Sequence, residues 1–462
     1  MSSSTPKWVA EELSSLDLGD QRRNNRTKRM VQRFADRPGG SIPSMCENDA
    51  EAKAAYRLLS NDAVEPQAIR AALQNACVGR LGGLDVVLVP QDTMFLDFTS
   101  HPKTAGLGPT GGGDGSASHG MIVHSAIAIS GDGVPLGLLH QQVWARDPDT
   151  VGGKRHRKQR PLEDKESYRW LQTARAVEAA VPGHIQLIQI ADREGDIFEL
   201  FAEPRRPNSH LLIRSSHDRR VQNPHRRLRN EVRAAPVADE FMMPVRQRPD
   251  RKAREAHLEL RFCSVTIEPP RDGVHDPSLS PVTLTAVLVT EPDPPKGVKR
   301  IEWLLLTDLP VGDTPQALLC LRYYGLRWLI ERYHYVLKSG CGIERSQLRN
   351  AEGLERLLAL FSAVALRLLW MTYAARTDGD QCCTVLFSRV EWQLLCRRVQ
   401  GDALPDEPPS LREAVRWTAL LGGFLGRTGD GEPGVKVLWR GLMRLQDIVV
   451  GFLLASGDVG KA

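Results

Sequence analysis

The sequence lacks the features that mark secreted, membrane-spanning and zinc-binding proteins. Its 462 residues include eight cysteines, with no Cys-x-x-Cys pair and no histidine at metal-ligand spacing, which argues against a structural zinc site and favours reduced thiols. The N-terminus, MSSSTPKWVAEEL, has no apolar signal-peptide core. The longest apolar run, 357–366, is interrupted by Arg367 and is too short to span a bilayer. We therefore expect a cytoplasmic protein with no membrane partner.

Basic charge is present in separate groups, although the net charge is only +5. Between residues 21 and 37 there are seven basic residues and a single acid, Asp36. Further basic runs occur at 154–160, 219–233 and 246–254. One such run is usually a solvated face, but several separate groups are typical of a protein that neutralises phosphates. The charge pattern therefore predicts nucleic-acid binding.

The hydrophobic pattern predicts an α/β protein with three regions. Residues 1–72 have the pattern of short helices, and residues 376–462 are again helical. The region between them, 73–375, mixes buried strands with helices and contains an Arg- and Pro-rich segment of alternating strands at 217–314. Near the end of the chain, apolar residues with steps of 4, 3, 4 and 3 form a short heptad stripe: Leu438, Leu442, Leu445, Val449 and Phe452. This stripe either packs within the chain or pairs two subunits.

Two apolar strands each run directly into an aspartate, VVLVPQDT into Asp92 and IQLIQIAD into Asp192. An acid at the end of a buried strand needs a hydrogen bond, an ion pair or a metal ion, or else caps a turn. If the two strands are neighbours in one sheet, the two carboxylates lie side by side. Three nearby acids compete with them for a functional role: Asp97, Glu194 and Asp196.

The stretch YYGLRWLIERYHYVLK has helical periodicity and an unusual polar face. At 100° per residue, four polar side chains fall within an arc of roughly 60°: Tyr324, Arg327, Glu331 and Lys338. The face is either a solvated, salt-bridged surface or part of an active site. In the second case Glu331 joins the two aspartates, and three oxygen donors suit Mg²⁺ or Mn²⁺. Two such ions support phosphodiester chemistry, with Arg327 and Lys338 near backbone phosphates and Tyr324 donating a hydrogen bond to one.

The spacing Tyr-x2-Arg-x3-Glu-x6-Lys resembles the YREK signature of the bacterial DDE transposases of the insertion sequence four family. Other segments resemble the same family in the same order along nearly the whole chain: LDLGDQRRNNR, AYRLLSN, QDTMFLDF, GLLHQQVWAR, ADREGDI, EWLLLTDLPV and LGGFLGRTGDGEPG. This resemblance implies a ribonuclease H-like catalytic core, interrupted by a β-rich insertion at 217–314. It also implies cut-and-paste transposition through a hairpin intermediate by a homodimer on paired DNA ends.

By position, the resemblance implies a catalytic and metal-binding triad of Asp92, Asp192 and Glu331. It places Trp303 beside a flipped base, where the alternative is a core residue of a strand, and Arg214 beside the hairpin. The expected end-recognition residues share the first basic helix: Arg22, Arg23, Arg26, Arg29 and Arg33. Two other classes of protein stay open, a catalytically inactive end-binding protein and another ribonuclease H-like nuclease.

Overall fold

The computed structural model describes residues 5–111, 118–148, 160–245, 247, 252–271, 278–401 and 404–456. The chain divides into two compact units: unit 1 comprises Met1–Gly83, Thr93–Val151 and Leu329–Ala462, and unit 2 comprises Leu84–Asp92 and Gly152–Trp328. The predicted helical regions 1–72 and 376–462 both fall in unit 1, whereas the predicted insertion 217–314 falls in unit 2. Much of the basic run 154–160 and the arginines at 246, 248 and 251 lie outside the described residues.

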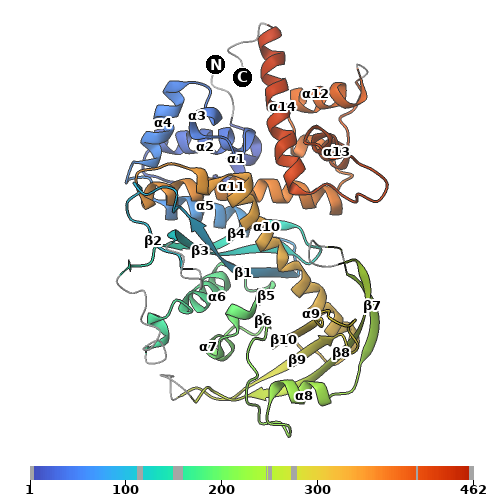
Figure 1. Ribbon diagram of the computed structural model, residues 1–462. Coiled ribbons are helices and arrows are strands. Elements are labelled where there is room, and N and C mark those ends of the chain that lie inside the picture. The colour runs from blue at the N-terminus through green and yellow to red at the C-terminus, as the bar shows by residue number, and fades with distance from the viewer. Residues whose placement is uncertain are drawn as a thin grey trace. The chain divides into compact units, whose positions relative to one another are not determined.

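Unit 2 is built on a mixed sheet in which the strand order is β1-β5-β6-β10-β9-β8-β7. The strands are β1 (Val86–Asp97, which continues into unit 1), β5 (Gln186–Ala191), β6 (Ser209–Arg214), β7 (Asp239–Val245), β8 (Arg254–Ile267), β9 (Val282–Thr290) and β10 (Glu302–Thr307). β1, β5 and β6 are parallel, and each later pairing is antiparallel. The large mixed sheet confirms the α/β prediction (Figure 1).

The strands form where the spacing of apolar residues is that expected of a β-strand. β5 is buried at five consecutive positions, as a central parallel strand must be, whereas β8 alternates because one of its faces is more exposed. The predicted insertion strands are confirmed as β8, β9 and β10. The sequence prediction missed β7, an edge strand whose sequence, DEFMMPV, carries acids and a proline. Such residues are common on edge strands because they discourage pairing with another chain.

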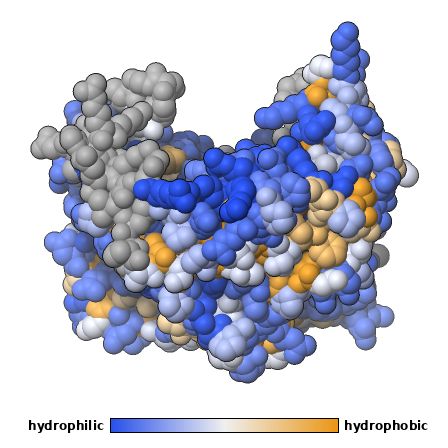
Figure 2. All heavy atoms as spheres, turned by 90° about the horizontal axis from the view of Figure 1, so that it is seen from below, coloured by the Kyte–Doolittle hydropathy of each residue, from blue (hydrophilic) through white to orange (hydrophobic). Residues whose placement is uncertain are grey.

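Helices and a large apolar cluster complete unit 2. The helices are α6 (Tyr168–Ala180), α7 (Phe198–Ala202), α8 (Leu228–Ala234) and α9 (Thr314–Leu326). Trp170 and Phe198 are fully or almost fully buried in a core that also takes Val265 of β8 and Leu306 of β10. The insertion therefore shares one hydrophobic core with the parallel strands. Hydrophilic residues cover most of the face drawn in Figure 2.

Unit 1 contains a β-hairpin and the N-terminal helices. β3 (His119–Ser130) and β4 (Pro135–Trp144) are antiparallel, and β2 (Gly108–Pro109) pairs with β3. The helices are α1 (Lys7–Glu12), α2 (Gln21–Asp36), α3 (Ile42–Met45), α4 (Asp49–Leu59) and α5 (Pro66–Gly79). Asp20 caps α2 by accepting from the backbone of Arg22. The buried residues of α2 recur every three or four positions and include Met30 and Phe34, so the helix is amphipathic.

The core of unit 1 is α11 (Ala351–Thr377). This helix is long and apolar enough to cross a membrane, but 83% of its most apolar window is buried inside the structure, as expected for a core helix. Phe361 packs edge-on against Phe34, with ring centroids 5.3 Å apart. The guanidinium of Arg356 donates to the carbonyls of Leu59 and Val64 and pairs with Asp62, which fastens the end of α4 to α11.

The C-terminal helices of unit 1 are α10 (Trp328–Tyr335), α12 (Arg389–Gln400), α13 (Leu411–Leu421) and α14 (Val435–Ala455). The predicted apolar stripe on α14 has two parts. Leu438 and Leu445 are fully buried, so this part packs within the chain. Further along α14, Phe452 of the stripe is 40% exposed, and Leu454, which lies outside the stripe, is 59% exposed. This exposed end of the helix is available to a partner subunit.

Candidate active site

Two of the predicted acids lie side by side. β1 and β5 are parallel, with a register that runs from Val86 opposite Gln186 to Pro90 opposite Ile190. Two further steps along each chain bring Asp92 level with Asp192. Paired strands lie about 4.8 Å apart, so the two carboxylates start from adjacent backbone positions. The prediction that these strands are neighbours is confirmed.

Asp192 also caps a short turn. One of its carboxylate oxygens accepts from the backbone N–H of Glu194 at 2.8 Å, at the start of the 3-10 turn Arg193–Gly195. The capping interpretation of this residue is therefore correct. A cap uses one oxygen, and the carboxylate keeps further acceptor capacity for a ligand.

Arg327 connects Asp92 to the end of α9. Its Nη1 lies 3.9 Å from Oδ2 of Asp92, and the two side chains are 15% and 18% exposed. The guanidinium also lies over the ring of Tyr324, 5.9 Å from its centroid. Contact with the Tyr324 ring restricts the conformations of the Arg327 side chain, and part of this side chain stays exposed to solvent.

Tyr324 is buried beside Trp303. Their ring centroids are 5.6 Å apart, with an angle of 70° between the planes. Burial raises the pKa of the Tyr324 phenol, Arg327 and Arg214 oppose this shift, and Asp192 adds to it. The phenol therefore remains protonated and can donate a hydrogen bond. Tyr324 thus lies within electrostatic reach of one of the paired aspartates.

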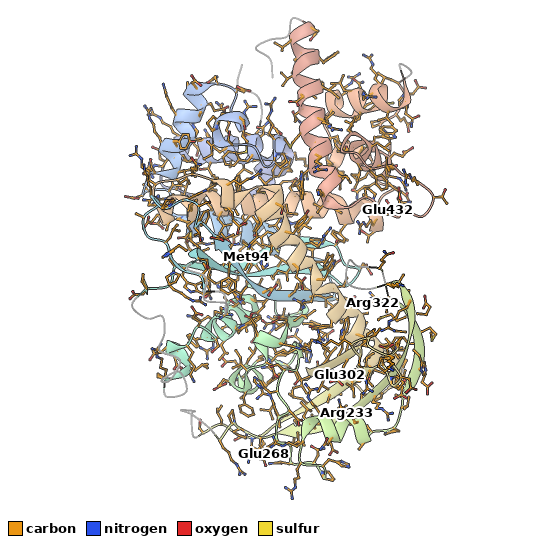
Figure 3. All side chains as sticks on the ribbon, in the orientation of Figure 1. Met94, Arg233, Glu268, Glu302, Arg322 and Glu432 are labelled. Carbon is orange, nitrogen blue, oxygen red and sulfur yellow. The ribbon has the colours of Figure 1, made fainter. Side chains whose placement is uncertain are left out.

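Arg214, at the end of β6, completes this cluster. Its guanidinium lies over the Trp303 ring at 5.7 Å, and its Nη2 donates to the backbone carbonyl of Glu302 at 3.0 Å. The Glu302 carboxylate in turn accepts from Arg229 at 2.6 Å and from Arg233 at 2.7 Å, both on α8 (Figure 3 labels Glu302 and Arg233). The sequence prediction missed Glu302. No local sequence signal points to this acid, because its arginine partners lie about seventy residues earlier in the chain.

The structure assigns structural roles to two competing acids in unit 2. The Asp196 side chain is fully buried, pairs with Arg219 at 2.6 Å, and accepts from the backbones of Ser216 and His217. It therefore fixes the segment that follows Arg214. Glu194 pairs with Arg169 at 2.9 Å on a more exposed surface. By comparison, the Nη1 of Arg327 lies 3.9 Å from the Asp92 carboxylate.

The predicted regular helix through residues 323–338 is wrong in its details. α9 ends at Leu326, α10 begins at Trp328, and Val336–Gly340 is a π-helix closed by a bond from the Cys341 N–H to the Val336 carbonyl. Ideal spacing at 100° per residue therefore does not extend to Lys338. The left-handed Gly342 (φ 71°) ends this segment.

Glu331 and Lys338 belong to unit 1, whereas the two aspartates and Tyr324 belong to unit 2. Glu331 is exposed on α10, and Lys338 pairs with Glu344 at 3.1 Å. Asp97, the third competing acid, accepts from the Thr99 hydroxyl and backbone, which lowers its pKa. Within the described ranges, no three His, Cys, Asp or Glu side chains form a group that could hold a metal ion. The triad therefore stays a prediction.

The predicted end-recognition arginines of α2 are not equivalent. Arg23 donates to the Leu18 carbonyl, and Arg33 pairs with Glu47 and Glu51, so these two hold the N-terminal helices together. The side chains of the other three make no hydrogen bond or ion pair with the described part of the chain: Arg22, Arg26 and Arg29.

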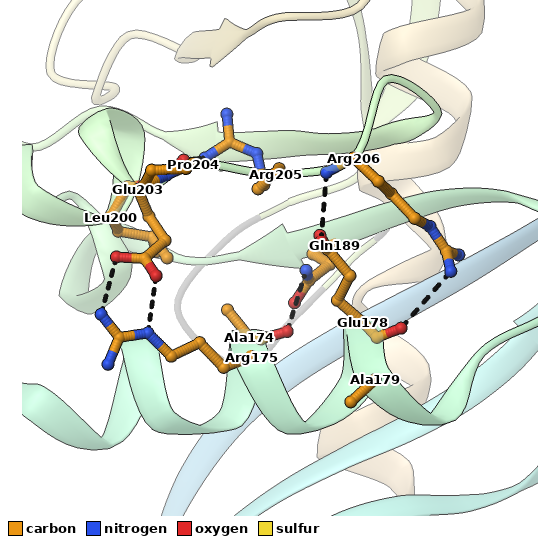
Figure 4. Close-up of a pocket in the computed structure, with 10 residues that line it drawn as sticks. All are labelled: Ala174, Arg175, Glu178, Ala179, Gln189, Leu200, Glu203, Pro204, Arg205 and Arg206. Carbon is orange, nitrogen blue, oxygen red and sulfur yellow. Dashed lines mark hydrogen bonds and ion pairs between the residues drawn. The ribbon is translucent and has the colours of Figure 1, made fainter. Parts of the chain in front are cut away.

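The pocket in Figure 4 contains none of the predicted site residues. It lies among α6, β5 and α7, has a volume of about 310 Å³, and is lined by charged groups that already have partners. Arg175 makes two bonds to Glu203, at 2.6 and 2.9 Å, and the backbone N–H of Arg206 donates to Glu178. Because these charged groups pair with one another, we interpret the pocket as a feature of the fold and not as a binding site.

Comparison with known protein families identifies both ends of the chain. Residues 5–64 match the family model described as transposase DNA-binding, and residues 363–457 match the transposase Tn5 dimerisation domain. The chain is a Tn5-like transposase. It therefore acts on DNA, with an N-terminal segment that binds DNA and a C-terminal segment for homodimer formation.

The two matches cover the helical ends of this transposase and leave residues 65–362 between them. The first match includes α2 with its arginines, and the second includes α14 with its exposed apolar end. Asp92, Asp192, Trp303 and Glu331 all lie between the matches. Neither match covers these residues, so their roles stay predictions.

Proposed function

We propose that this transposase excises and inserts DNA by metal-dependent phosphodiester chemistry at Asp92, Asp192 and Glu331. The pairing of β1 with β5 carries this proposal, because it brings Asp92, within β1, and Asp192, just after β5, together beside two arginines and a protonated tyrosine. Parallel neighbouring strands that carry these two acids also support a ribonuclease H-like core.

The donor set fits a hard cation, because carboxylate oxygens are the ligands that Mg²⁺ and Mn²⁺ prefer. When bound, two such ions activate the attacking oxygen and stabilise the leaving one. Asp92 and Asp192 hold this group from neighbouring strands, and Glu331 supplies the third carboxylate. The protein's own cations, Arg327 and Lys338, neutralise the phosphates that flank the scissile bond, and Tyr324 donates to one phosphate oxygen.

Arg214 and Trp303 act on the DNA end itself. The tryptophan stacks on a base turned out of the helix, and the arginine, held by the Glu302 carbonyl, stabilises the tight hairpin. The order of steps is 3′-strand nicking, hairpin formation and resolution, and strand transfer into target DNA. These transposition steps take place in the bacterial cytoplasm, at the nucleoid.

Recognition and pairing of ends lie in unit 1. Arg22, Arg26 and Arg29 of α2 contact the inverted-repeat ends, since their guanidiniums are not engaged by the described residues. The exposed end of α14, with Phe452 and Leu454, packs against the same helix of a second subunit. This division leaves Arg23 and Arg33 as residues that support the fold.

The test uses a plasmid carrying the gene's own inverted repeats, incubated with purified protein and Mg²⁺, and measures release of linear DNA. We expect excision by the wild-type protein, and none in EDTA or with Glu331→Gln or Asp192→Asn. Glu194→Gln is the matched control, because it neutralises an acid two residues from Asp192 that has an arginine partner. Specific end binding without cutting, in Mn²⁺ as well, would instead identify a catalytically inactive end-binding protein.

A further inference from the structure

The hairpin that joins β9 to β10 carries three exposed cations at residues 296, 299 and 300. β1, β5 and β6 are parallel, so Asp92, Asp192 and Arg214 lie at one end of the sheet. β10 runs antiparallel to β6, and β9 antiparallel to β10, so the hairpin 291–301 projects from this same end. It lies outside both segments that match transposase families.

The hairpin is built to hold its shape. The Glu291 N–H donates to the Ile301 carbonyl at 2.9 Å, which closes its base. The buried Glu291 carboxylate is paired through both oxygens with Arg254, and this pairing lowers the pKa of Glu291. At the tip, Val298 donates to Pro295 across a turn whose third residue, Gly297, has a left-handed φ of 80°. Three prolines, at 292, 294 and 295, restrict the backbone further.

Two of the three cations have no partner among the described residues. Lys296 and Lys299 make no ion pair with the described residues, and Arg300 donates only to the carbonyl of Pro292. A surface lysine normally keeps its rotational freedom on a mobile loop. Here a rigid support presents three positive charges and one exposed acid, Asp293, and its rigidity reduces the entropy lost when an anion binds.

We infer that the hairpin 291–301 binds the phosphate backbone of duplex DNA next to the cleavage site. Arg300 precedes Trp303 by three residues, a span of at most about 10 Å. One DNA strand rises 3.4 Å per nucleotide, so Arg300 meets a phosphate within about three nucleotides of the base that Trp303 contacts. The inference rests on the proposed function and adds a DNA contact to it. The DNA is either the transposon end or the target.

The other end of the sheet provides a matched control. The bridge between Val221 and Ile267 places the loop 222–227 where β8 ends, about 26 Å along that strand from Glu259, the residue level with the base of the hairpin. This region carries three exposed arginines: Arg226, Arg227 and Arg271. Two triple variants therefore remove equal charge from opposite ends: Lys296→Gln, Lys299→Gln, Arg300→Gln; and Arg226→Gln, Arg227→Gln, Arg271→Gln.

The experiment measures affinity of the full-length protein for a labelled transposon-end duplex between 50 and 200 mM salt, and then strand transfer into target DNA. Three phosphate contacts contribute about 2.7 to the slope of log Kobs against log salt. If the hairpin holds the transposon end, the hairpin variant loses two to three units of slope and about 10- to 100-fold in affinity. If it holds target DNA, end binding is unchanged and strand transfer falls by a similar factor. The opposite-end variant matches the wild type in both cases.

The inference is overturned if the hairpin variant matches the wild type in both assays, or if the opposite-end variant loses as much as the hairpin variant. A wild-type protein that neither binds nor joins DNA would overturn the proposed function as well. Thermal melting of both variants checks the fold, and we expect no shift because all six side chains are exposed.

Discussion

Carboxylates in unit 2 fall into two groups that differ in how closely arginines hold them. In the first, Arg219–Asp196, Arg175–Glu203 and Arg205–Asp308 pair at 2.6 to 2.9 Å. In the second, Asp92 has its arginine at 3.9 Å, and Asp192 uses one oxygen as a cap. A closely paired carboxylate has little capacity for another ligand. This difference fits the proposal that the first group holds the fold and that the second serves the chemistry.

The strongest test of this comparison neutralises, one at a time, two acids that lie four residues apart. We expect Asp192→Asn to reduce plasmid excision by about 1,000-fold or more, because several kcal/mol of charge stabilisation is lost. Its free energy of unfolding should change by less than about 1 kcal/mol. Asp196→Asn should destabilise the protein by about 3–5 kcal/mol, because Arg219 is left buried without its charge partner. Excision assays and urea unfolding measure the two effects.

The comparison fails if Asp192→Asn unfolds the protein and Asp196→Asn leaves both stability and excision intact. Each variant replaces a carboxylate by an amide of the same size, so loss of volume cannot account for the result. A variant that loses excision in proportion to its folded fraction is defective in folding, not in chemistry.

Asp36, on α2 in unit 1, represents a third kind of carboxylate. Burial and the negative charge of Glu391 raise its pKa to about 7, against the opposing effect of Arg33 and Arg37. Between pH 4 and pH 7 the folded protein therefore holds a proton that the unfolded chain releases, so stability falls as pH rises through this window. Each pKa unit corresponds to about 1.4 kcal/mol, which gives a total of a few kcal/mol.

Asp36→Asn should remove this decline. The variant and the wild type should be equally stable at pH 4, and the variant should be more stable by a few kcal/mol at pH 8, as measured by thermal or urea unfolding. Parallel stability curves for the two proteins across this range would show that Asp36 carries its charge at no cost in the folded state.

A smaller effect is expected from removing one hydroxyl group, that of Tyr324, beside the proposed active site. Tyr324→Phe keeps the edge-on contact with Trp303 and removes only the hydroxyl. We expect a 10- to 100-fold fall in excision, because one hydrogen bond to a charged phosphate is lost, and a change in stability of about 1 kcal/mol at most. Tyr323→Phe, at the neighbouring buried tyrosine, is the control and should retain activity. Equal activity of both variants would remove the Tyr324 hydroxyl from the mechanism.

The two apolar strands could be predicted from the sequence because their signal is local, although β1 continues past Asp92 to Asp97. Apolar runs that end in Asp92 and Asp192 predict buried strands, and the structure pairs them as neighbours. The helical periodicity of α2 likewise predicts its buried face. At these positions the spacing of apolar residues within a short segment was sufficient to predict the secondary structure.

Partners distant in sequence could not be predicted. Glu302 accepts from Arg229 and Arg233, about seventy residues earlier, and only the fold brings them together. The π-helix before Cys341 also escaped prediction, since ideal helical spacing contains no signal for a local change of hydrogen bonding. The same limit applies to Arg23 and Arg33, which have the charge of a DNA contact but are held by protein groups.

The prediction with the smallest expected effect asks whether the bond length of an ion pair or its burial determines how much the pair contributes to stability. Arg175 and Glu203 make two bonds of 2.6 and 2.9 Å, as short as those between Arg219 and Asp196, and this pairing raises the pKa of Arg175. However, the Arg175 side chain is 52% exposed, whereas that of Asp196 is fully buried. Exposed pairs contribute about 0–1 kcal/mol, so Glu203→Gln should cost less than 1 kcal/mol in urea unfolding. If it costs as much as Asp196→Asn, bond length and not burial determines how strongly these acids hold the fold.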